Sequence, residues 1–108
     1  MTNRAQQNPI LKRFRVTLDE IYGDRLERVV LYGSRARGDA RDDSDYDVAV
    51  FLRDIGDRMA EMNRLASLAT DILYDTGEFI HAVPYRAGFY NDPREPLMHE
   101  IRAEGLDL

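Results

Sequence analysis

The stretch from Asp45 to Leu52, in which two aspartates open an apolar strand, constrains the fold of this sequence most. Side chains in a strand alternate between its two faces. One face therefore carries Tyr46, Val48, Val50 and Leu52, and the other carries Asp45, Asp47, Ala49 and Phe51. The two carboxylates share a face with their Cα atoms roughly 7 Å apart. Tyr46 lies on the opposite face, so we expect it in the core.

Local signals before this strand predict one helix and one further strand. Asn8 as a cap and Pro9 as the first helical residue predict a helix that Gly23 ends. Apolar residues recur at helical spacing between these points. The residues from Leu26 to Tyr32 then predict a buried strand.

After Leu52 the sequence predicts two more helices and a third strand. A long helix is expected from Ile55 to Asp75, a strand from Glu78 to Pro84, and a last helix from Pro96 to Ala103. The expected apolar stripe of the long helix is Ile55, Met59, Met62, Leu65, Ala66, Ala69, Ile72 and Leu73. The order α-β-β-α-β-α predicts an α/β (α+β) fold, a mixed β-sheet with helices packed against it. We expect residues 1–108 to form a single domain.

A turn at Gly33 and Ser34 follows the first strand, and ten residues separate Ser34 from Asp45. A glycine lets backbone N–H groups approach a phosphate closely, and the serine hydroxyl can donate to it. A short helix beginning near Arg35 would add a favourable dipole. Arg35 could itself contact the triphosphate, with a surface salt bridge as the alternative. The turn therefore predicts a phosphate site formed by Gly33, Ser34 and Arg35.

The pair Asp45 and Asp47 predicts a metal site beside this turn. Two close carboxylates repel each other unless a cation lies between them. Mg²⁺ is the natural cation, because it is a hard ion that binds one or two carboxylates together with substrate phosphates.

Composition narrows the classes of function. The chain has no cysteine, which excludes disulfides, thiolate zinc sites and cysteine nucleophiles, and which fits a reducing cytoplasm. The segment from Met1 to Asn8 is polar and unlike a signal peptide. No apolar run approaches the ~20 residues that cross a bilayer, so we expect no membrane partner. The net charge of −5 speaks against nucleic acid as a main partner.

Taken together, Gly33-Ser34, ten residues and then Asp45-x-Asp47 before an apolar strand resemble the signature of the DNA polymerase beta-like nucleotidyltransferase superfamily. The run from Arg35 to Gly38, Ser44 and the segment from Ile101 to Gly105 resemble its small branch, the minimal nucleotidyltransferases. The resemblance implies a polymerase beta-like core and Mg²⁺-dependent transfer of a nucleoside monophosphate, with ATP as the expected donor. It also implies a HEPN-type toxin as partner, with this chain as an antitoxin that transfers AMP to a hydroxyl of the toxin.

One position departs from the superfamily pattern. The superfamily has a third carboxylate on the strand that corresponds to Glu78–Pro84, and Glu78 is the candidate here, early in that strand. His81 is a poor substitute, since Mg²⁺ prefers oxygen ligands, and we expect it to be a partly buried strand residue. The alternative is a degraded site in a binding module that masks its partner. Glu78 at the metal would favour the enzyme, and Ile80 or His81 in that space would favour the module.

Apolar residues on two predicted helices exceed what a chain of this size is expected to bury. They lie on the helix from Ile55 to Asp75 and around Leu97, Met98 and Ile101. A protein partner or a second copy of the chain could cover what remains exposed.

Overall fold

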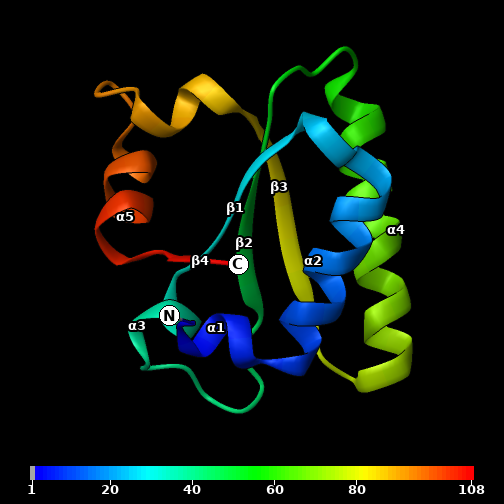
Figure 1. Cartoon of the computed structure of the whole chain (residues 1–108). Helices are drawn as coiled ribbons and strands as arrows, with labels where there is room; N and C mark the ends of the chain where they lie inside the picture. The colour runs from blue at the N-terminus through cyan, green and yellow to red at the C-terminus, as the bar shows by residue number, and fades with distance from the viewer. Residues whose placement is uncertain (1) are drawn as a thin grey trace.

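The computed structural model describes residues 2–108 as a four-stranded sheet with helices on both faces (Figure 1). The strands are β1 (Leu26–Tyr32), β2 (Tyr46–Leu52), β3 (Ile80–Arg86) and β4 (Leu106–Asp107). The helices are α1 (Arg4–Gln7), α2 (Pro9–Tyr22), α3 (Ser34–Arg37), α4 (Arg58–Thr76) and α5 (Pro96–Glu104). Short 3₁₀ turns span Gly23–Arg25 and Ala87–Asn91. The predicted mixed sheet is confirmed.

The strand order β3-β2-β1-β4 sets the neighbours of the site. β1 runs antiparallel to β2, and β2 runs parallel to β3, with α4 as the crossover between them. Asp47 is paired with Tyr32 of β1 on one side and with His81 of β3 on the other. Side chains paired across neighbouring strands project from the same face. These three residues therefore meet at one end of the sheet, on one face.

The core has one part on each face of the sheet. α2 and α4 cover the first face, whose largest buried residues include Phe14, Leu18, Val48, Val50 and Leu65. α5 covers the second face, where the buried residues are Val30, Ala49, Phe51, Met98 and Ile101. The predicted alternation along β2 is thus confirmed, because even-numbered residues enter the first part of the core and Ala49 and Phe51 enter the second.

α2 begins and ends as the sequence predicts. The Asn8 side chain accepts hydrogen bonds from the backbone N–H groups of Ile10 and Leu11, and Pro9 is the first helical residue. Gly23 ends the helix with a positive φ of 52°. The cap satisfies two of the N–H groups that have no partner inside a helix. α2 is therefore fixed by contacts that are local in sequence.

α4 differs from the prediction in its start and in its buried face. It begins at Arg58, three residues later than expected, because the Asp57 carboxylate caps it by accepting from the N–H of Ala60. Its buried residues are Glu61, Leu65, Ala69 and Ile72, whereas Met59, Met62 and Leu73 are exposed. Ala66 is exposed as well, and Ile55 lies ahead of the helix. The predicted stripe was therefore wrong at these five residues. None of the helices between residues 2 and 108 has both the length and the hydropathy of a membrane span.

β3 forms a free edge of the sheet, and it begins two residues later than predicted. The N–H of Tyr46 donates to the carbonyl of Phe79 at 2.9 Å. In a parallel ladder, alternate residues direct their backbone groups to the neighbouring strand and away from it. Phe79 bonds to β2, so the even-numbered residues of β3, Pro84 among them, direct theirs to the free edge. Proline lacks an N–H, so it costs no ladder hydrogen bond there. The Pro84 carbonyl accepts from Nη1 of Arg58 at 2.6 Å.

Candidate active site

Gly33 turns the chain directly behind the Asp47 carboxylate. The residue is buried, and its φ of 72° lies in the region that favours glycine. A Cβ at this position would lie 2.6 Å from Oδ2 of Asp47, well inside a normal contact distance. The sequence therefore needs glycine here for two reasons, the backbone conformation and the close approach to the carboxylate.

Ser34 follows as the first residue of α3, so the helix begins one residue earlier than expected. The Gly33 carbonyl accepts from the N–H groups of Ala36 and Arg37, which closes the first helical turn. Tyr32 pairs with Asp47 across the sheet, and the half-buried Ser34 follows Tyr32 by two residues in the chain. The predicted phosphate turn and the predicted carboxylate thus come together at the end of β1.

Asp47 and Asp45 lie near this turn. The Asp47 side chain is 35% exposed on β2, and Asp45 is exposed just ahead of the strand, which begins one residue later than predicted. Within residues 2–108 neither carboxylate takes part in a side-chain hydrogen bond. Hard oxygen donors of this kind fit Mg²⁺.

These carboxylates would not complete a metal shell by themselves. Over residues 2–108 no group of three or more His, Asp and Glu side chains could hold a metal ion. Mg²⁺ commonly keeps waters and substrate phosphates in its shell alongside one or two carboxylates. The donor set therefore fits a metal that arrives with a phosphorylated substrate better than a metal that is permanently resident.

His81 lies beside Asp47, with 3.6 Å between its Nδ1 and Oδ1 of the aspartate. The expectation of a partly buried histidine was wrong, since the side chain is 59% exposed. The parallel register that pairs His81 with Asp47 puts the imidazole on the carboxylate face. Ile80, by contrast, is fully buried on the opposite face. Of these two residues, His81 is the one that fills the space beside Asp47.

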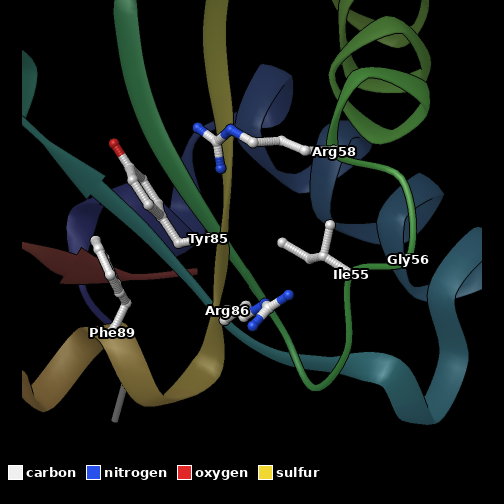
Figure 2. A pocket seen from close by; sticks show the side chains of 6 residues that line it. All are labelled: Ile55, Gly56, Arg58, Tyr85, Arg86 and Phe89. Atoms are coloured by element: carbon white, nitrogen blue, oxygen red, sulfur yellow. The ribbon is translucent and has the colours of Figure 1, made fainter.

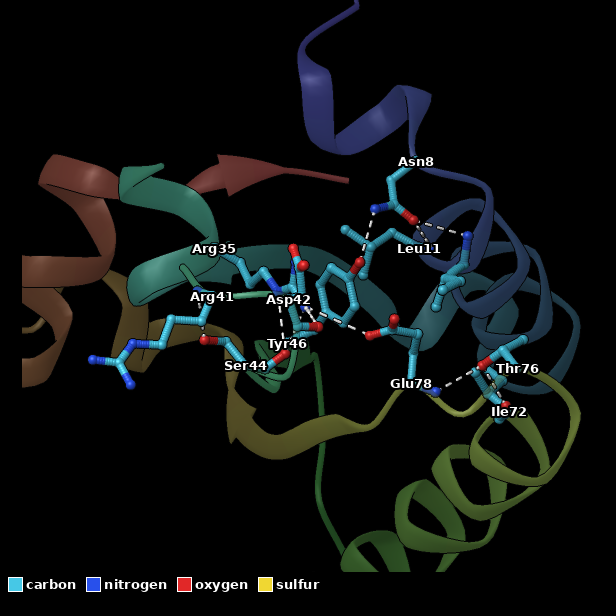
Figure 3. A network of polar contacts seen from close by, with 11 residues as sticks. Asn8, Leu11, Arg35, Arg41, Asp42, Ser44, Tyr46, Ile72, Thr76 and Glu78 are labelled. Atoms are coloured by element: carbon cyan, nitrogen blue, oxygen red, sulfur yellow. Dashed lines mark hydrogen bonds and ion pairs between the residues drawn. The ribbon is translucent and has the colours of Figure 1, made fainter. Parts of the chain in front are cut away.

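Glu78 and Arg35 lie together near Tyr46, on the side of β2 opposite to Asp47 (Figure 3). The Glu78 Oε2 atom is 3.5 Å from Nη2 of Arg35. The Arg35 guanidinium lies over the ring of Tyr46, with 4.4 Å between its Cζ atom and the ring centroid. Tyr46 is buried on the face opposite to Asp47, as expected. The predicted site residues thus form two groups, with Gly33, Ser34 and Asp47 in one and Arg35 and Glu78 in the other.

Tyr32 is a neighbour of the site that sequence reasoning missed. It pairs with Asp47 across the sheet, and burial raises the pKa of its phenol to about 12, with smaller contributions from the neighbouring Tyr85 phenol and Asp47 carboxylate. The one signal in the sequence was its place as the last residue before the Gly33 turn, two positions after the inward-facing Val30.

A separate hollow of about 370 Å³ lies at the opposite end of β3 (Figure 2). Ile55 and Arg58 line one side, and Tyr85 and Phe89 line the other, with their rings 6.0 Å apart. The Arg58 guanidinium lies 5.8 Å from the Tyr85 ring centroid. None of the predicted site residues lines this hollow.

The sequence matches one family model and two curated relatives. A family model described as polymerase beta, nucleotidyltransferase matches residues 18–106. A protein of Methanocaldococcus jannaschii, named provisionally as the protein adenylyltransferase MJ0141, is 41% identical over 46 residues, which span 43% of this chain and 46% of that relative. A second such protein of the same organism, MJ0604, is 30% identical over 81 residues, 75% of each chain.

Solved structures with the same fold come from toxin–antitoxin complexes. A chain of a toxin–antitoxin crystal structure with AMP-PNP superposes with a TM-score of 0.61 at 20% identity, over 89% of this chain and 70% of that one. A complex of a tri-AMPylated HEPN toxin of Shewanella oneidensis with an MNT antitoxin gives a TM-score of 0.52 at 18% identity, over 89% and 66% of the two chains. At these identities the likeness concerns the fold.

Proposed function

Because the chain belongs to the polymerase beta nucleotidyltransferase family, we propose that it binds ATP with Mg²⁺ and transfers AMP to a hydroxyl of a protein. The observation that carries this proposal is the contact of Gly33 with Asp47, which sets a turn of the phosphate-binding kind against a free carboxylate. The names of the two Methanocaldococcus relatives support AMP as the group transferred.

Each residue of the site has a role in this proposal. Asp45 and Asp47 would hold Mg²⁺, while the backbone at Gly33 and the hydroxyl of Ser34 would hold the triphosphate. The bound ion would neutralise phosphate charge and make the α-phosphorus easier to attack. The sheet keeps Gly33 and Asp47 in place through the pairing of Tyr32 with Asp47, so the phosphate and the metal side of the site stay aligned.

The chemical step is a displacement at the α-phosphorus. The acceptor hydroxyl oxygen forms a bond to this phosphorus, the bond to the β-phosphate oxygen breaks, pyrophosphate leaves, and the hydroxyl proton passes to solvent. A third carboxylate would help to position and deprotonate the acceptor, but His81 is the residue beside Asp47. General-base assistance is worth about 10²–10⁴-fold in rate, so we expect slow transfer.

A HEPN-type toxin is the acceptor that we propose, with the chain acting as its antitoxin in the cytoplasm. The resemblance to minimal nucleotidyltransferases supports this, as do the toxin–antitoxin complexes with the same fold. The exposed Met59, Met62 and Leu73 of α4 give the chain apolar surface that a partner could cover.

A second candidate function is a binding module that neutralises the same partner by masking it. One observation favours it, the presence of the His81 imidazole where a carboxylate would complete the catalytic site. Mg²⁺ prefers oxygen ligands, so a neutral imidazole would hold it poorly. In this case nucleotide binding would survive without efficient transfer.

Calorimetry of ATP binding with and without Mg²⁺ tests the site. We expect Asp45→Asn with Asp47→Asn to lose the metal dependence, and Asp43→Asn, which removes an exposed carboxylate of the same loop, to keep it. Equal metal dependence in the double variant and the parent would refute the assignment.

Co-expression with the candidate toxin, followed by transfer of label from α-labelled ATP, separates the two functions. The double variant should bind the toxin without relieving its toxicity if the chain acts by transfer. Relief of toxicity by that variant would show masking.

A further inference from the structure

Arg35 contacts the loop that leads to Asp45 and lies away from the face of Asp47. We propose that Arg35, anchored by Glu78, is a positioning residue that fixes residues 42–45 and thereby holds Asp45 where it can bind Mg²⁺. The inference rests on the proposed function, because it assigns Asp45 to the metal. It gives Arg35 and Glu78 one joint role.

The hydrogen bonds of Arg35 converge on the two carbonyls that shape the end of the loop (Figure 3). The Nε and Nη2 atoms donate to the carbonyl of Ser44 at 3.1 and 2.8 Å, and Nη2 also donates to the carbonyl of Asp42 at 3.2 Å. Ser44 directly precedes Asp45 in the chain. Fixing its carbonyl therefore fixes the peptide from which the Asp45 side chain departs.

The guanidinium is itself held from two further sides. It stacks on the Tyr46 ring at 4.4 Å, and Glu78 lies 3.5 Å from Nη2. The Tyr46 hydroxyl accepts from Nδ2 of Asn8 at 3.1 Å, which ties the ring to the start of α2. The Arg35 side chain is only 19% exposed. Its planar fork matches this arrangement, which a lysine ammonium could not reproduce.

The start of the loop has attachments of its own, since the Asp39 N–H donates to the Ser34 carbonyl at 3.2 Å and the Asp39 carboxylate pairs with Arg37 at 3.3 Å. Asp39, Arg41, Asp42 and Asp43 are exposed. Within the loop, Ser44 and Arg41 form a local turn, in which the Arg41 N–H donates to Ser44 Oγ at 2.9 Å and the Ser44 N–H donates to the Arg41 carbonyl at 3.0 Å. This turn gives the loop its shape but does not attach it to the sheet. The contacts of Arg35 with the carbonyls of Asp42 and Ser44 attach the end of the loop.

The position of Glu78 is consistent with the same role. Its carboxylate touches Arg35 on the Tyr46 side, and it was the candidate for a third metal ligand. Residues that orient metal ligands typically change metal affinity by about 10–100-fold when they are mutated. Glu78 can therefore affect metal binding through Arg35 without touching the metal.

Arg37 provides a matched control two residues further along α3. Its guanidinium pairs with Asp39 at 3.3 Å and with Glu100 and Glu104 at 3.4 Å each, and its side chain is 39% exposed. These exposed pairs should contribute little to stability. Arg37→Gln thus removes the same charge from the same short helix without releasing the carbonyl of Ser44.

The experiment measures the Mg²⁺ concentration that half-saturates ATP binding in the parent, Arg35→Gln, Arg35→Lys, Glu78→Gln, Arg37→Gln and the double variant of Arg35 and Glu78. We expect Arg35→Gln to raise it about 10-fold or more, with ATP binding in the absence of Mg²⁺ unchanged. Arg35→Lys should be intermediate and Glu78→Gln milder. The double variant should match Arg35→Gln alone, because residues in one network are not additive, and Arg37→Gln should match the parent.

Three outcomes would overturn the inference. Weaker ATP binding in Arg35→Gln both with and without Mg²⁺ would place Arg35 on the triphosphate. Additive effects of Arg35→Gln and Glu78→Gln, or complete loss of metal dependence in Glu78→Gln, would make Glu78 a ligand. Unchanged metal dependence in every Arg35 variant would remove the role altogether.

Hydrogen exchange tests the attachment of the loop independently of whether the proposed function is correct. If the parent shows no Mg²⁺-dependent ATP binding, the proposed function fails, and the amide exchange of residues 42–45 then tests the attachment of the loop. Exchange there should be faster in Arg35→Gln than in the parent and Arg37→Gln. Equal exchange in all three, with the variants folded by circular dichroism, would refute the attachment.

Discussion

The Tyr22 phenol and the Glu61 carboxylate are buried together between α2 and α4, beneath Arg25 and Arg64. The guanidinium carbons of the two arginines lie 5.5 and 5.8 Å from the Tyr22 ring centroid, and their nitrogens lie 3.9 and 3.8 Å from Oε1 of Glu61. Burial, and then the Glu61 carboxylate, raise the pKa of Tyr22 well above its ordinary value. The folded chain therefore favours the neutral phenol.

The Tyr22 shift predicts a loss of stability at alkaline pH. Between the unfolded pKa near 10 and the higher folded pKa, the unfolded chain binds fewer protons, so the stability from this shift is present below pH about 10 and is lost above it. Urea unfolding from pH 8 to 11 should show a steeper fall for the parent than for Tyr22→Phe. Tyr74→Phe, at an 84% exposed tyrosine, should follow the parent. Parallel curves for all three would contradict the prediction.

The buried face of α4 predicts which of its apolar residues stabilise the fold. Leu65 is fully buried, so Leu65→Ala should cost about 2–5 kcal/mol in the free energy of unfolding. Met59 is 63% exposed, so Met59→Ala should stay within about 0.5 kcal/mol of the parent. Chemical denaturation measures both. A large cost at Met59 would restore the stripe that the sequence predicted.

Gly33→Ala should damage both the fold and the site. A Cβ would meet the Asp47 carboxylate, and alanine is strained at a φ of 72°, so we expect a loss of more than about 1 kcal/mol in stability together with loss of Mg²⁺-dependent ATP binding. Gly56→Ala is the control, since a Cβ there meets nothing within 4 Å. Calorimetry and thermal unfolding report the two effects separately. If the alanine variant binds ATP and Mg²⁺ as the parent does, the site does not require glycine at position 33.

Substitutions on the exposed side of α4 should weaken binding of the proposed partner without affecting the fold. Met59→Ser with Met62→Ser should leave the unfolding free energy nearly unchanged and reduce co-purification with the proposed HEPN-type partner. Thr70→Ser, a conservative change at another exposed residue of the helix, is the control. If the double change instead alters the sedimentation of the chain alone, this face joins two copies. Unchanged behaviour in both assays would exclude it as an interface.

Elements with local signals could be predicted from the sequence. The caps of α2 and the alternation along β2 depend on neighbouring residues, and both were right. The face of α4 was not, because its methionines and leucines occur on both sides of the helix. Burial of Glu61 depends on Tyr22 and Arg25, which lie far from Glu61 in the sequence. No periodicity reports such a pairing.

The site divides in the same way. The meeting of Gly33 with Asp47 follows from a strand, a turn and a strand that are consecutive in sequence, and the motif predicted it. The place of His81 depends on the register of β3 against β2, which the long crossover through α4 leaves open. A shift of one residue would have turned the imidazole to the other face. The sequence therefore predicted the approach of the Gly33 turn to Asp47 better than it predicted which residue of β3 lies beside that carboxylate.

The contact between Pro84 and Arg58 bears on how the protein behaves at high concentration. An open sheet edge can recruit a strand from a neighbouring molecule and seed aggregates. On β3 one of the outward-facing residues offers no N–H, and its carbonyl is already occupied by a guanidinium. A foreign strand would find its hydrogen-bonding run interrupted there. Loss of that arginine would therefore appear as poorer solubility during concentration or refolding.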